Sequence, residues 1–349
     1  MGDSLPWWDK ARHAARRDKL LARARIARAV RDWFHERGFL EVEPQALQVS
    51  PGNETHLHGF STDIDGLDGS RTQRFLHTSP EFAMKKLLAA GEEKIFALAR
   101  VWRNREASGL HANEFTMLEW YRAGRPFTAL MEDCAALLRL AARDGLTGKA
   151  RWRGRDCDLT AEPERLTLIE AFARHAGVDL EACLPGVAAD PRGALAVEAA
   201  RIGVRVSGDD GWSDLFSKVL SERIEPALGE GRATILTAYP VSEAALARPD
   251  PADPRFAERF ELYVCGVELA NAFGELTDAA EQRRRFEADM DEKRRIYGER
   301  YPLDEDFLSA LAHMPPASGA ALGFDRLVML ACGAARLDEV VWTPEAPPG

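Results

Sequence analysis

The sequence has 349 residues, of which 46% are hydrophobic, and a formal net charge of −10. A chain of this length can bury one large core or two modest ones. It contains no signal core and no apolar stretch approaching the roughly 18 to 20 residues of a membrane helix, so we expect a cytoplasmic protein with no membrane partner. Its five cysteines show no CxxC or Cys/His metal spacing, which predicts reduced, mostly buried thiols and no zinc site.

The first predicted element is a basic amphipathic helix that ends near Gly38. Between Lys10 and Arg37 the sequence holds ten Lys or Arg residues against three Asp or Glu residues, so the rest of the chain is strongly acidic. The basic face could dock an acidic partner or nucleic acid, or it could be the solvated side of the helix. Phosphate-backbone binding needs a strong positive surface, so the acidic remainder argues against tRNA as a partner. The apolar face of the predicted helix consists of Leu20, Leu21, Ile26, Val30, Trp33 and Phe34.

Three strands are predicted after this helix. Residues 39–43 alternate apolar and acidic side chains, as a half-buried strand does. Residues 94–102 and 114–121 are dense in aromatic and β-branched side chains, and the polar residues 104–113 separate them. This pattern predicts an antiparallel pair of strands joined by a long loop.

A β-hairpin that carries two carboxylates is predicted near residues 260–270. Two apolar runs flank Cys265-Gly266, which is typical of a two-residue turn. If Val264 faces Val267, then Glu261 faces Ala270, and Glu268 lies on the same face, about 7 to 8 Å away on the diagonal. Such a pair could bind a hard cation, although two solvated strand carboxylates would give the same pattern.

The remaining segments contain few residues that suggest a catalytic or binding role. Residues 145–211 are alanine-rich and helical in pattern, and we expect 145–250 to be a variable helical segment. Residues 319–330 hold small side chains, then Gly323-Phe324-Asp325-Arg326, and an apolar helix start at Leu327. The sequence has no GxGxxG fingerprint or Walker-type loop, so any nucleotide must be held by other means.

Four separated stretches resemble lysyl-tRNA synthetase in order and spacing. They are TSPE at 78–81, RVWRNREASGLHANEFTMLEWY at 100–121, RFELYVCGVELANAFGELTD at 259–278 and GFDRLVML at 323–330. The stretches around Arg103 and Arg326 are similar to motifs 2 and 3 of the class II synthetases. The resemblance implies an α+β fold, in which an antiparallel β-sheet is flanked by helices, and a homodimer.

The chain is too short for a complete lysyl-tRNA synthetase. The family carries an anticodon-binding barrel before the catalytic core, and here the first helix begins too early to leave room for it. We therefore expect residues 1–349 to form a single catalytic domain. In this respect the chain resembles the free-standing paralogues of the synthetase, ligases that attach (R)-β-lysine to a lysine of elongation factor P. Ala321 stands where the synthetase has a glycine, and the resemblance implies that its methyl group favours β-lysine over α-lysine.

The resemblance also implies ATP and Mg²⁺ as cofactors. Adenylation brings a carboxylate towards the α-phosphate, so the site must supply positive charge and alignment. Arg103 matches the arginine that contacts the α-phosphate and the substrate carboxylate. Phe115 and Arg326 match the pair that sandwiches adenine, whereas outside these motifs they would suggest core packing or a surface charge. Glu261 and Glu268 match the magnesium ligands. The other ATP-binding positions that the resemblance implies are Asn104, Arg105, His111, Ala112, Leu269 and Gly323.

A lysine-like substrate brings two ammonium groups, for which buried carboxylates are the natural partners. The resemblance matches Glu81, Glu119 and Glu275 to these partners, and it matches Tyr121 and Asn271 to further hydrogen bonds. In the second half-reaction a target amine attacks the adenylate and releases AMP, and the sequence shows no obvious general base for that step. The remaining substrate-binding positions that the resemblance implies are Ser79, Pro80 and Ala321.

Three positions depart from the family pattern. Motif 2 normally reads Arg-Asn-Glu, with the glutamate on adenine, but Arg105 holds that position here and Glu106 follows it as a candidate substitute. His111 is followed by Ala112-Asn113 instead of Asn-Pro, in the loop over ATP. The proline expected after the first strand is displaced to Pro44, which bears on the dimer interface.

Two other functions fit the sequence. An enzyme of the same fold could activate α-lysine for a small molecule, a carrier protein or tRNA, and Ala321 argues only against tRNA. A non-catalytic relative could bind lysine or an adenylate as a regulatory signal. The intact Arg103, Glu261, Glu268 and Arg326 argue against this second function, while Arg105 keeps it open.

Overall fold

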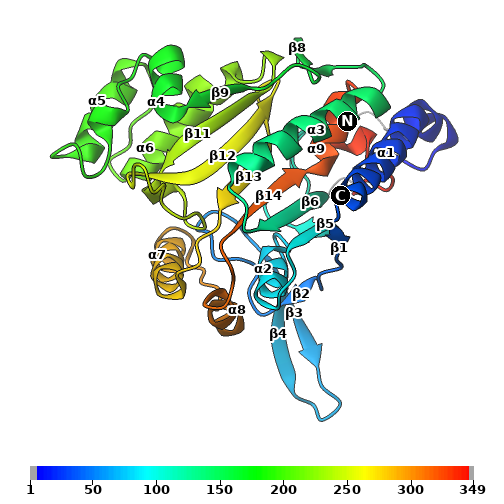
Figure 1. The fold of residues 1–349 in the computed structure, drawn as a ribbon, viewed down its shortest axis with the longest axis horizontal. Helices are drawn as coiled ribbons and strands as arrows, with labels where there is room; N and C mark the ends of the chain where they lie inside the picture. Colours follow the sequence, from blue (N-terminus) through cyan, green and yellow to red (C-terminus); the bar gives the residue numbers. More distant parts are fainter. Residues whose placement is uncertain (1–5, 346–349) are drawn as a thin grey trace.

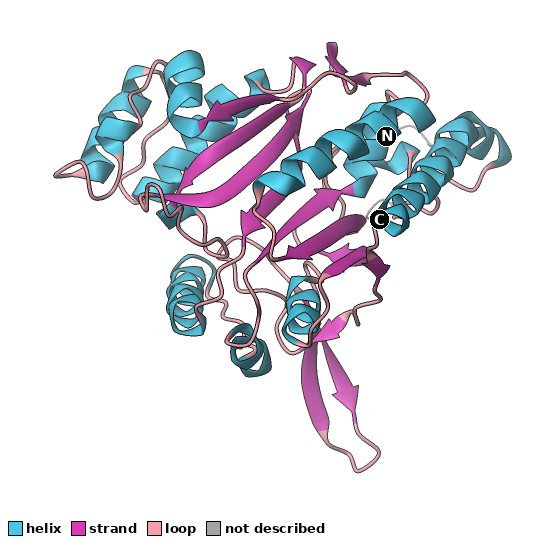
Figure 2. Cartoon of the chain, viewed as in Figure 1, coloured by secondary structure: helices cyan, strands magenta, loops and turns pink. Residues whose placement is uncertain are grey.

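An eight-stranded sheet forms the centre of the molecule in the computed structural model, which describes residues 6–345 (Figures 1 and 2). The six inner strands are antiparallel, and each edge strand pairs in parallel with its neighbour. The predicted α+β fold with an antiparallel sheet flanked by helices is confirmed, with two short parallel edges added. In spatial order the strands are β1 (Leu40–Glu41), β5 (Lys94–Trp102), β6 (Glu114–Ala123), β14 (Ala317–Gly323), β13 (Val267–Gly274), β12 (Phe256–Val264), β11 (Thr234–Pro240) and β9 (Glu164–Thr167).

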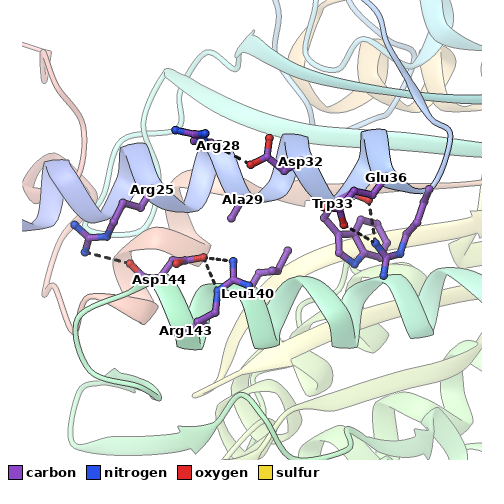
Figure 3. A pocket seen from close by; sticks show the side chains of 10 residues that line it. Arg25, Arg28, Ala29, Asp32, Trp33, Glu36, Leu140, Arg143 and Asp144 are labelled. Carbon is purple, nitrogen blue, oxygen red and sulfur yellow. Dashed lines mark hydrogen bonds and ion pairs between the residues drawn. The ribbon is translucent and has the colours of Figure 1, made fainter.

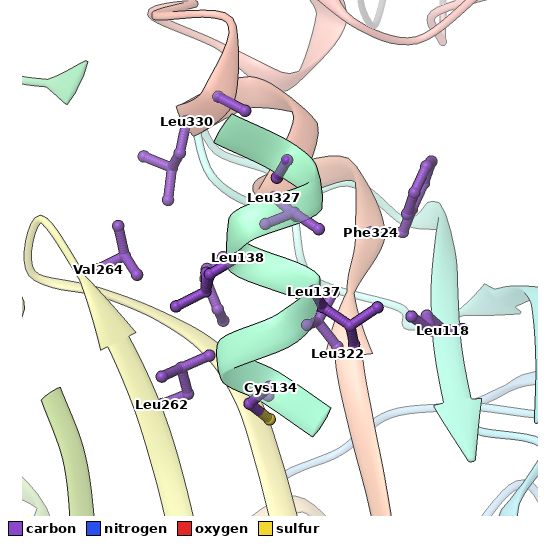
Figure 4. Close-up of a cluster of buried hydrophobic side chains, with 14 of the residues drawn as sticks. Leu118, Cys134, Leu137, Leu138, Leu262, Val264, Leu322, Phe324, Leu327 and Leu330 are labelled. Atoms are coloured by element: carbon purple, nitrogen blue, oxygen red, sulfur yellow. The ribbon is translucent and has the colours of Figure 1, made fainter. Parts of the chain in front are cut away.

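Three helices cover one face of the sheet, namely α1 (Lys10–Glu36), α3 (Thr128–Asp144) and α9 (Phe324–Ala331). In Figure 4, Leu137 and Leu138 of α3 lie among Leu262 of β12, Leu322 of β14 and Leu118 of β6. The predicted apolar face of α1 is buried, although Leu21 is only partly so. Burial of this face supplies most of the stability of such a helix.

The opposite face of the sheet is covered only at its two ends. At one end α2 (Glu81–Ala89), α7 (Ala279–Tyr297) and α8 (Glu305–Leu311) enclose an apolar cluster against β5 and β6. At the other end α4 (Leu168–Ala171), α5 (Pro191–Arg201) and α6 (Trp212–Val219) pack against β11 and β12. The middle of this face, over β6, β14, β13 and β12, is therefore left for a ligand.

The segment 145–250 is not simply helical, which corrects that expectation. Strands β9 and β11 extend the main sheet, and a separate three-stranded sheet consists of β7 (Ala150–Trp152), β8 (Arg155–Asp158) and β10 (Gly231–Arg232). The alanine-rich pattern conceals these strands because they are short. A third sheet contains β2 (Leu47–Gln48), β3 (Phe60–Asp65) and β4 (Arg71–Leu76), and its β3–β4 ribbon projects away from the main sheet (Figure 1).

The predicted hairpin and its Val264–Val267 pair are confirmed, but its register is not. Cys265 and Gly266 both have positive φ, at 54° and 74°, as a type I′ turn requires. The register then shifts at Leu269, so Glu261 faces Asn271 and not Ala270. A β-bulge adds one residue to a strand and thereby changes which side chains share a face. Here it places Asn271 on the face that carries Glu261.

The end of the chain also differs from the expectation. Residues 317–323 form the central strand β14, and α9 begins at Phe324, three residues before the predicted helix start. Among residues 6–345, no helix is long and apolar enough to cross a membrane. All five cysteines are buried and free, as predicted.

We predict that Phe34→Ala will destabilise the protein by about 3 to 5 kcal/mol, because a buried ring leaves a cavity. The Phe34 side chain is 0% exposed and stacks on Phe96 with 4.5 Å between ring centroids. Denaturant unfolding followed by tryptophan fluorescence measures this change. Leu67→Ala, at a fully exposed position of the β3–β4 ribbon, is the control and should change the free energy of unfolding by less than about 0.5 kcal/mol. Equal effects of the two substitutions would contradict the packing described.

Candidate active site

A cavity of about 410 Å³ lies over the uncovered middle of the sheet, a size typical of small-molecule sites. All four stretches that resemble the synthetase contribute to its lining. Glu54, Glu106, Arg259 and Phe273 also line it, and the sequence analysis assigned a role only to Glu106 among them. The predicted site residues that line the cavity are Ser79, Glu81, Arg103, His111, Ala112, Phe115, Glu261, Glu268, Leu269, Asn271, Ala321, Gly323 and Arg326.

The register of the sheet explains why distant residues meet here. Glu119 pairs with Ala321, Ala321 with Asn271, and Asn271 with Glu261, in one row across β6, β14, β13 and β12. Directly paired residues in antiparallel strands present their side chains on the same face. The row therefore places one carboxylate at each end, with the Ala321 methyl group and the Asn271 amide between them.

The next row includes a glycine that is required by close packing. A Cβ atom at Gly319 would lie 2.3 Å from Cε1 of Tyr121 and 2.5 Å from Oε1 of Glu275. No side chain fits at such distances, so Gly319 allows Tyr121 and Glu275 to approach β14 closely. Neither of these predicted substrate-binding residues lines the cavity. Tyr121 donates a hydrogen bond to Glu119, and Glu275 pairs with Lys85, which also contacts Glu81.

Glu119, a predicted ammonium partner on the sheet row, is buried and lies just outside the cavity lining. Its Oε2 accepts a hydrogen bond from Ser79 Oγ and its Oε1 accepts one from the Tyr121 hydroxyl, both at 2.6 Å. Burial, reinforced by the nearby Glu81 carboxylate, raises the pKa of Glu119 to about 8. Without a bound cation this carboxyl group therefore holds a proton at neutral pH.

Glu81 and Glu275 share the ammonium group of Lys85, which the sequence analysis missed. Lys85 Nζ lies 2.6 Å from Glu275 Oε2 and also contacts Glu81, and its side chain is 1% exposed. Burial raises the pKa of Glu275 to about 7, although Lys85 opposes the shift. Glu81 and Lys85 stand four residues apart at the start of α2, a helical spacing that could have predicted the pair.

Glu54 is a fourth carboxylate in this part of the site. Burial and the Glu81 carboxylate raise its pKa to about 7, while Arg103 lowers it. Glu54 lies in a loop without periodicity, so no sequence pattern indicated its position. Glu81 and Glu275 contact the ammonium group of Lys85, and Glu54 and Glu119 interact electrostatically with Glu81, so this part of the site is strongly anionic.

The two motif arginines also line the cavity. Arg103 Nε donates to the Thr78 carbonyl at 3.3 Å, and its guanidinium lies 5.3 Å from the Phe115 ring centroid. Arg326 donates to the carbonyls of Glu268 at 2.9 Å and Leu110 at 3.1 Å. Backbone contacts hold both guanidinium groups at the cavity wall, where they can bind phosphate.

His111 also lines the cavity. Burial and the positive charges of Arg326 and Arg103 lower the pKa of His111. Its Nδ1 forms a 2.8 Å hydrogen bond with Ser108 Oγ in the loop between β5 and β6. A neutral His111 is expected near the phosphates at neutral pH.

The departure in motif 2 has a structural explanation. Arg105 does not line the cavity, has a φ of 65° and contacts Glu299, which also accepts from His58. Glu106 lines the cavity instead. The prediction that Arg105 contacts ATP is therefore not supported by its position, because its side chain pairs with the segment after α7. Asn104 and Pro80 also lie outside the cavity lining.

Glu261 and Glu268 both line the cavity, and they lie on the same face of the hairpin, as predicted. Glu261 accepts hydrogen bonds from the hydroxyls of Tyr239 and Tyr263, both at 2.6 Å, and pairs with Arg259 at 2.5 Å. Burial, reinforced by the Glu261 carboxylate, raises the pKa of Glu268. Residues 6–345 show no cluster of three or more His, Cys, Asp or Glu residues that could hold a metal alone. Two carboxylates do fit Mg²⁺, which usually takes one or two of them and fills its shell with phosphate oxygens and water.

A second hollow lies between α1 and α3, on the other face of the sheet (Figure 3). Arg25 donates to the Asp144 carbonyl at 3.3 Å, Arg143 pairs with the Asp144 carboxylate, and Arg28 pairs with Asp32. The lining holds four arginines against three carboxylates, so most of these charges offset one another at the surface.

Arg23, like Arg16, is a basic residue of α1 that is buried. Its Nη1 lies 2.6 Å from Asp325 Oδ1 and its Nη2 donates to Thr116 Oγ1 at 2.9 Å. Asp325 also accepts from the Thr116 backbone N–H at 3.1 Å. Arg23 therefore ties α1 to the segment that carries Arg326, a role that the sequence pattern of a solvated basic face did not indicate.

Comparison with known proteins places the chain in a family. A family model described as tRNA synthetases class II (D, K and N) matches residues 6–347. The "Elongation factor P--(R)-beta-lysine ligase" of Sodalis glossinidius (strain morsitans) is 39% identical over 346 residues, 98% of this chain and 98% of that protein. The protein with the same description from Vibrio cholerae is 39% identical over 332 residues, 93% of this chain and 95% of that protein. The "Lysine--tRNA ligase" of Pelotomaculum thermopropionicum is 36% identical over 324 residues, 92% of this chain and 62% of that protein.

We predict that Lys85→Met will destabilise the protein by about 3 to 5 kcal/mol at neutral pH, because it leaves buried carboxylates without their cation. Adding Glu275→Gln should restore part of this loss, because the double variant removes one of those carboxylates. Urea unfolding of the two single variants and the double variant forms a double-mutant cycle. Additive losses would mean that Lys85 and Glu275 do not stabilise each other.

Proposed function

The chain belongs to the class II tRNA synthetases of the D, K and N family, and from this membership we propose that it is an ATP-dependent, AMP-forming ligase. Its substrate is (R)-β-lysine, which it activates as the aminoacyl-adenylate and transfers to a lysine side chain of elongation factor P. Relatives described as elongation factor P--(R)-beta-lysine ligases match nearly the whole chain, which supports this choice of amino acid and acceptor.

The charged groups around the cavity carry the proposal. Glu54, Glu81, Arg103 and Arg326 line the cavity, and the buried carboxyl groups of Glu119 and Glu275 lie behind its wall. A lysine-like amino acid has the complementary charges, with two ammonium groups and one carboxylate. Glu81, Glu119 and Glu275 bind the ammonium groups, and the substrate carboxylate is directed towards Arg103.

Adenylation needs alignment and positive charge more than proton transfer. We assign Arg103 to the α-phosphate and the substrate carboxylate, and we place adenine between Phe115 and Arg326. Glu106 replaces Arg105 in contact with the nucleotide, because Glu106 lines the cavity. Glu261 and Glu268 would hold Mg²⁺, which would supply positive charge to offset that of the phosphates.

Ala321 lies where it can discriminate between amino acids. It stands between Glu119 and Asn271 on the sheet row, and it lines the cavity. A methyl group at this position takes space beside the substrate backbone. We propose that it favours the β-amino acid, whose amine is one carbon further from the carboxylate.

The organisation of the chain is part of the same proposal. We infer one catalytic domain, because β9 and β11 from the segment 145–250 extend the main sheet. A homodimer without tRNA as a partner is expected from the family resemblance and the acidic composition. A modifier of a translation factor would act in the cytoplasm.

Intact mass spectrometry of elongation factor P tests the proposed reaction directly. We predict that incubation with the enzyme, ATP, Mg²⁺ and (R)-β-lysine adds one lysyl group, and that α-lysine gives a smaller yield at the same concentration. A control without ATP should leave the mass unchanged. Pyrophosphate release without any change in mass would refute elongation factor P as the acceptor.

Ala321→Gly provides the matched variant for the choice of amino acid. It should move the ratio of kcat/KM values for β-lysine over α-lysine towards α-lysine by roughly 10-fold or more, since one methyl group in a pocket is worth about 1 to 3 kcal/mol. The same mass assay with both amino acids measures the ratio. An unchanged ratio would contradict the role given to Ala321.

We also predict that substrate binding releases protons. The pKa of Glu119 is raised to about 8 in the free protein, so its carboxyl group is mainly protonated at neutral pH. A bound ammonium group lowers this pKa and expels the proton, so affinity should rise with pH from about 6 to about 8. Calorimetry in buffers of different ionisation enthalpy should detect about one proton or more per site. Glu119→Gln should reduce that number by about one, and an equal release by both proteins would contradict the assignment.

A further inference from the structure

Glu54 occupies a position in the cavity that the adenylation step does not use. It lines the cavity together with Ser79, Glu81 and Arg103. Within residues 6–345, no other side chain donates a hydrogen bond to its carboxylate, whereas Glu119 accepts from Ser79 and Tyr121. The Glu54 carboxylate is therefore available to a ligand.

Two residues of α7, Lys293 and Asp289, hold the backbone around Glu54. Lys293 of α7 is fully buried, and its Nζ donates to the carbonyls of Thr55 at 2.9 Å and Leu57 at 2.6 Å, with the Glu54 carbonyl at 3.5 Å. Thr55 Oγ1 in turn donates to Asp289 at 3.3 Å. These contacts direct the carbonyls of Glu54, Thr55 and Leu57 towards α7. They thereby fix the loop that presents Glu54 to the cavity.

The loop also brings Glu54 close to Thr78, the first residue of the TSPE stretch. A Cβ atom at Gly52, whose φ is 132°, would lie 2.8 Å from Glu54 Oε2 and 3.0 Å from Thr78 Oγ1. The carbonyl of Thr78 accepts from Arg103. Gly52 therefore allows the Glu54 carboxylate to lie near Thr78, beside the segment that anchors Arg103.

Glu54 stands between the two ends of the proposed substrate. Its carboxylate interacts electrostatically with Glu81, which belongs to the ammonium end, and with Arg103, which belongs to the phosphate end. The carbonyl carbon of an adenylate joins these two ends. Among the cavity carboxylates, Glu81 contacts Lys85, and Glu261 is engaged by Arg259 and two tyrosines, so neither is as available to an incoming group.

We propose that Glu54 is the catalytic base of the second half-reaction, which accepts a proton from the ammonium group of the acceptor lysine. This inference rests on the proposed function. The neutral amine then attacks the adenylate carbonyl, a C–N bond forms, and the bond between the carbonyl carbon and the phosphate oxygen breaks to release AMP. The nitrogen loses its second proton to water as the amide forms, and Glu54 returns its proton to solvent.

The electrostatic surroundings of Glu54 suit this role. Its pKa is raised to about 7 by burial and by the carboxylates of Glu81 and Asp289, while Arg103 opposes the shift. Asp289 and Lys293 are the charged groups of α7 that interact electrostatically with Glu54, and burial lowers the pKa of Lys293. A base with a pKa near the working pH is the most effective in proton transfer. Transfer should therefore rise with pH as the Glu54 carboxyl group ionises.

Single-turnover transfer from preformed enzyme-bound adenylate tests the proposal. The wild-type protein and Glu54→Gln are each incubated with ATP, Mg²⁺ and (R)-β-lysine, freed of excess substrate, and mixed with elongation factor P from pH 6 to 9. We expect Glu54→Gln to form adenylate but to slow transfer by about 100-fold or more, and to lose the rise in rate near pH 7. Glu132→Gln is the control, because it makes the same change at an exposed carboxylate of α3 that lies outside the cavity lining.

The outcomes separate this inference from the proposed function. Normal transfer by Glu54→Gln with the wild-type pH profile would overturn the role of Glu54. An equal loss in Glu132→Gln would also overturn it, because the effect would then not be specific to the cavity. Failure of the wild-type protein to form any adenylate would instead refute the proposed function. Partial recovery of the pH-dependent rate in Glu54→Asp, which retains a carboxylate, would support the base.

Discussion

Glu81 and Glu275 contact the buried ammonium group of Lys85, and the carboxyl groups of Glu54 and Glu119 interact electrostatically with Glu81. Burying like charges together is unfavourable, and the raised pKa values of three of these carboxyl groups express that cost. Lys85 and the hydroxyl groups of Ser79 and Tyr121 offset only part of it. A substrate with two ammonium groups neutralises the remaining carboxylates. The unfavourable electrostatics of the empty site therefore favour a substrate that carries two positive charges.

The scaffold is organised to hold this arrangement. The antiparallel row from Glu119 to Glu261 places the site residues on one face, and the bulge at Leu269 brings Asn271 onto it. Gly319 lets Tyr121 and Glu275 pack closely behind the wall. On the opposite face the apolar helices bury the other side of the same strands. The strands are fixed from both sides, which is what a site needs if it is to hold repelling charges at set positions.

Much of this structure could be predicted from the sequence, for identifiable reasons. The strands at 94–102 and 114–121 have strong side-chain patterns, and the hairpin turn at Cys265-Gly266 has local turn chemistry. The motif residues were placed by resemblance, and the sheet register brings most of them together. Lys85 and Glu54 were missed because their partners lie elsewhere in the chain or in an irregular loop. The bulge at Leu269 and the pairing of Arg105 with Glu299 depend on tertiary contacts that periodicity does not encode.

The central claim, that buried carboxylates select a substrate with two ammonium groups, is tested most directly by ATP–pyrophosphate exchange with two amino acids of equal chain length. One is (R)-β-lysine and the other is (R)-3-aminohexanoic acid, which lacks only the terminal amine. The account predicts that kcat/KM falls by about 1,000-fold or more for the second compound, because it leaves buried carboxylates without a partner. A difference of less than about 10-fold would be no more than the loss of ordinary contacts, and it would contradict the account.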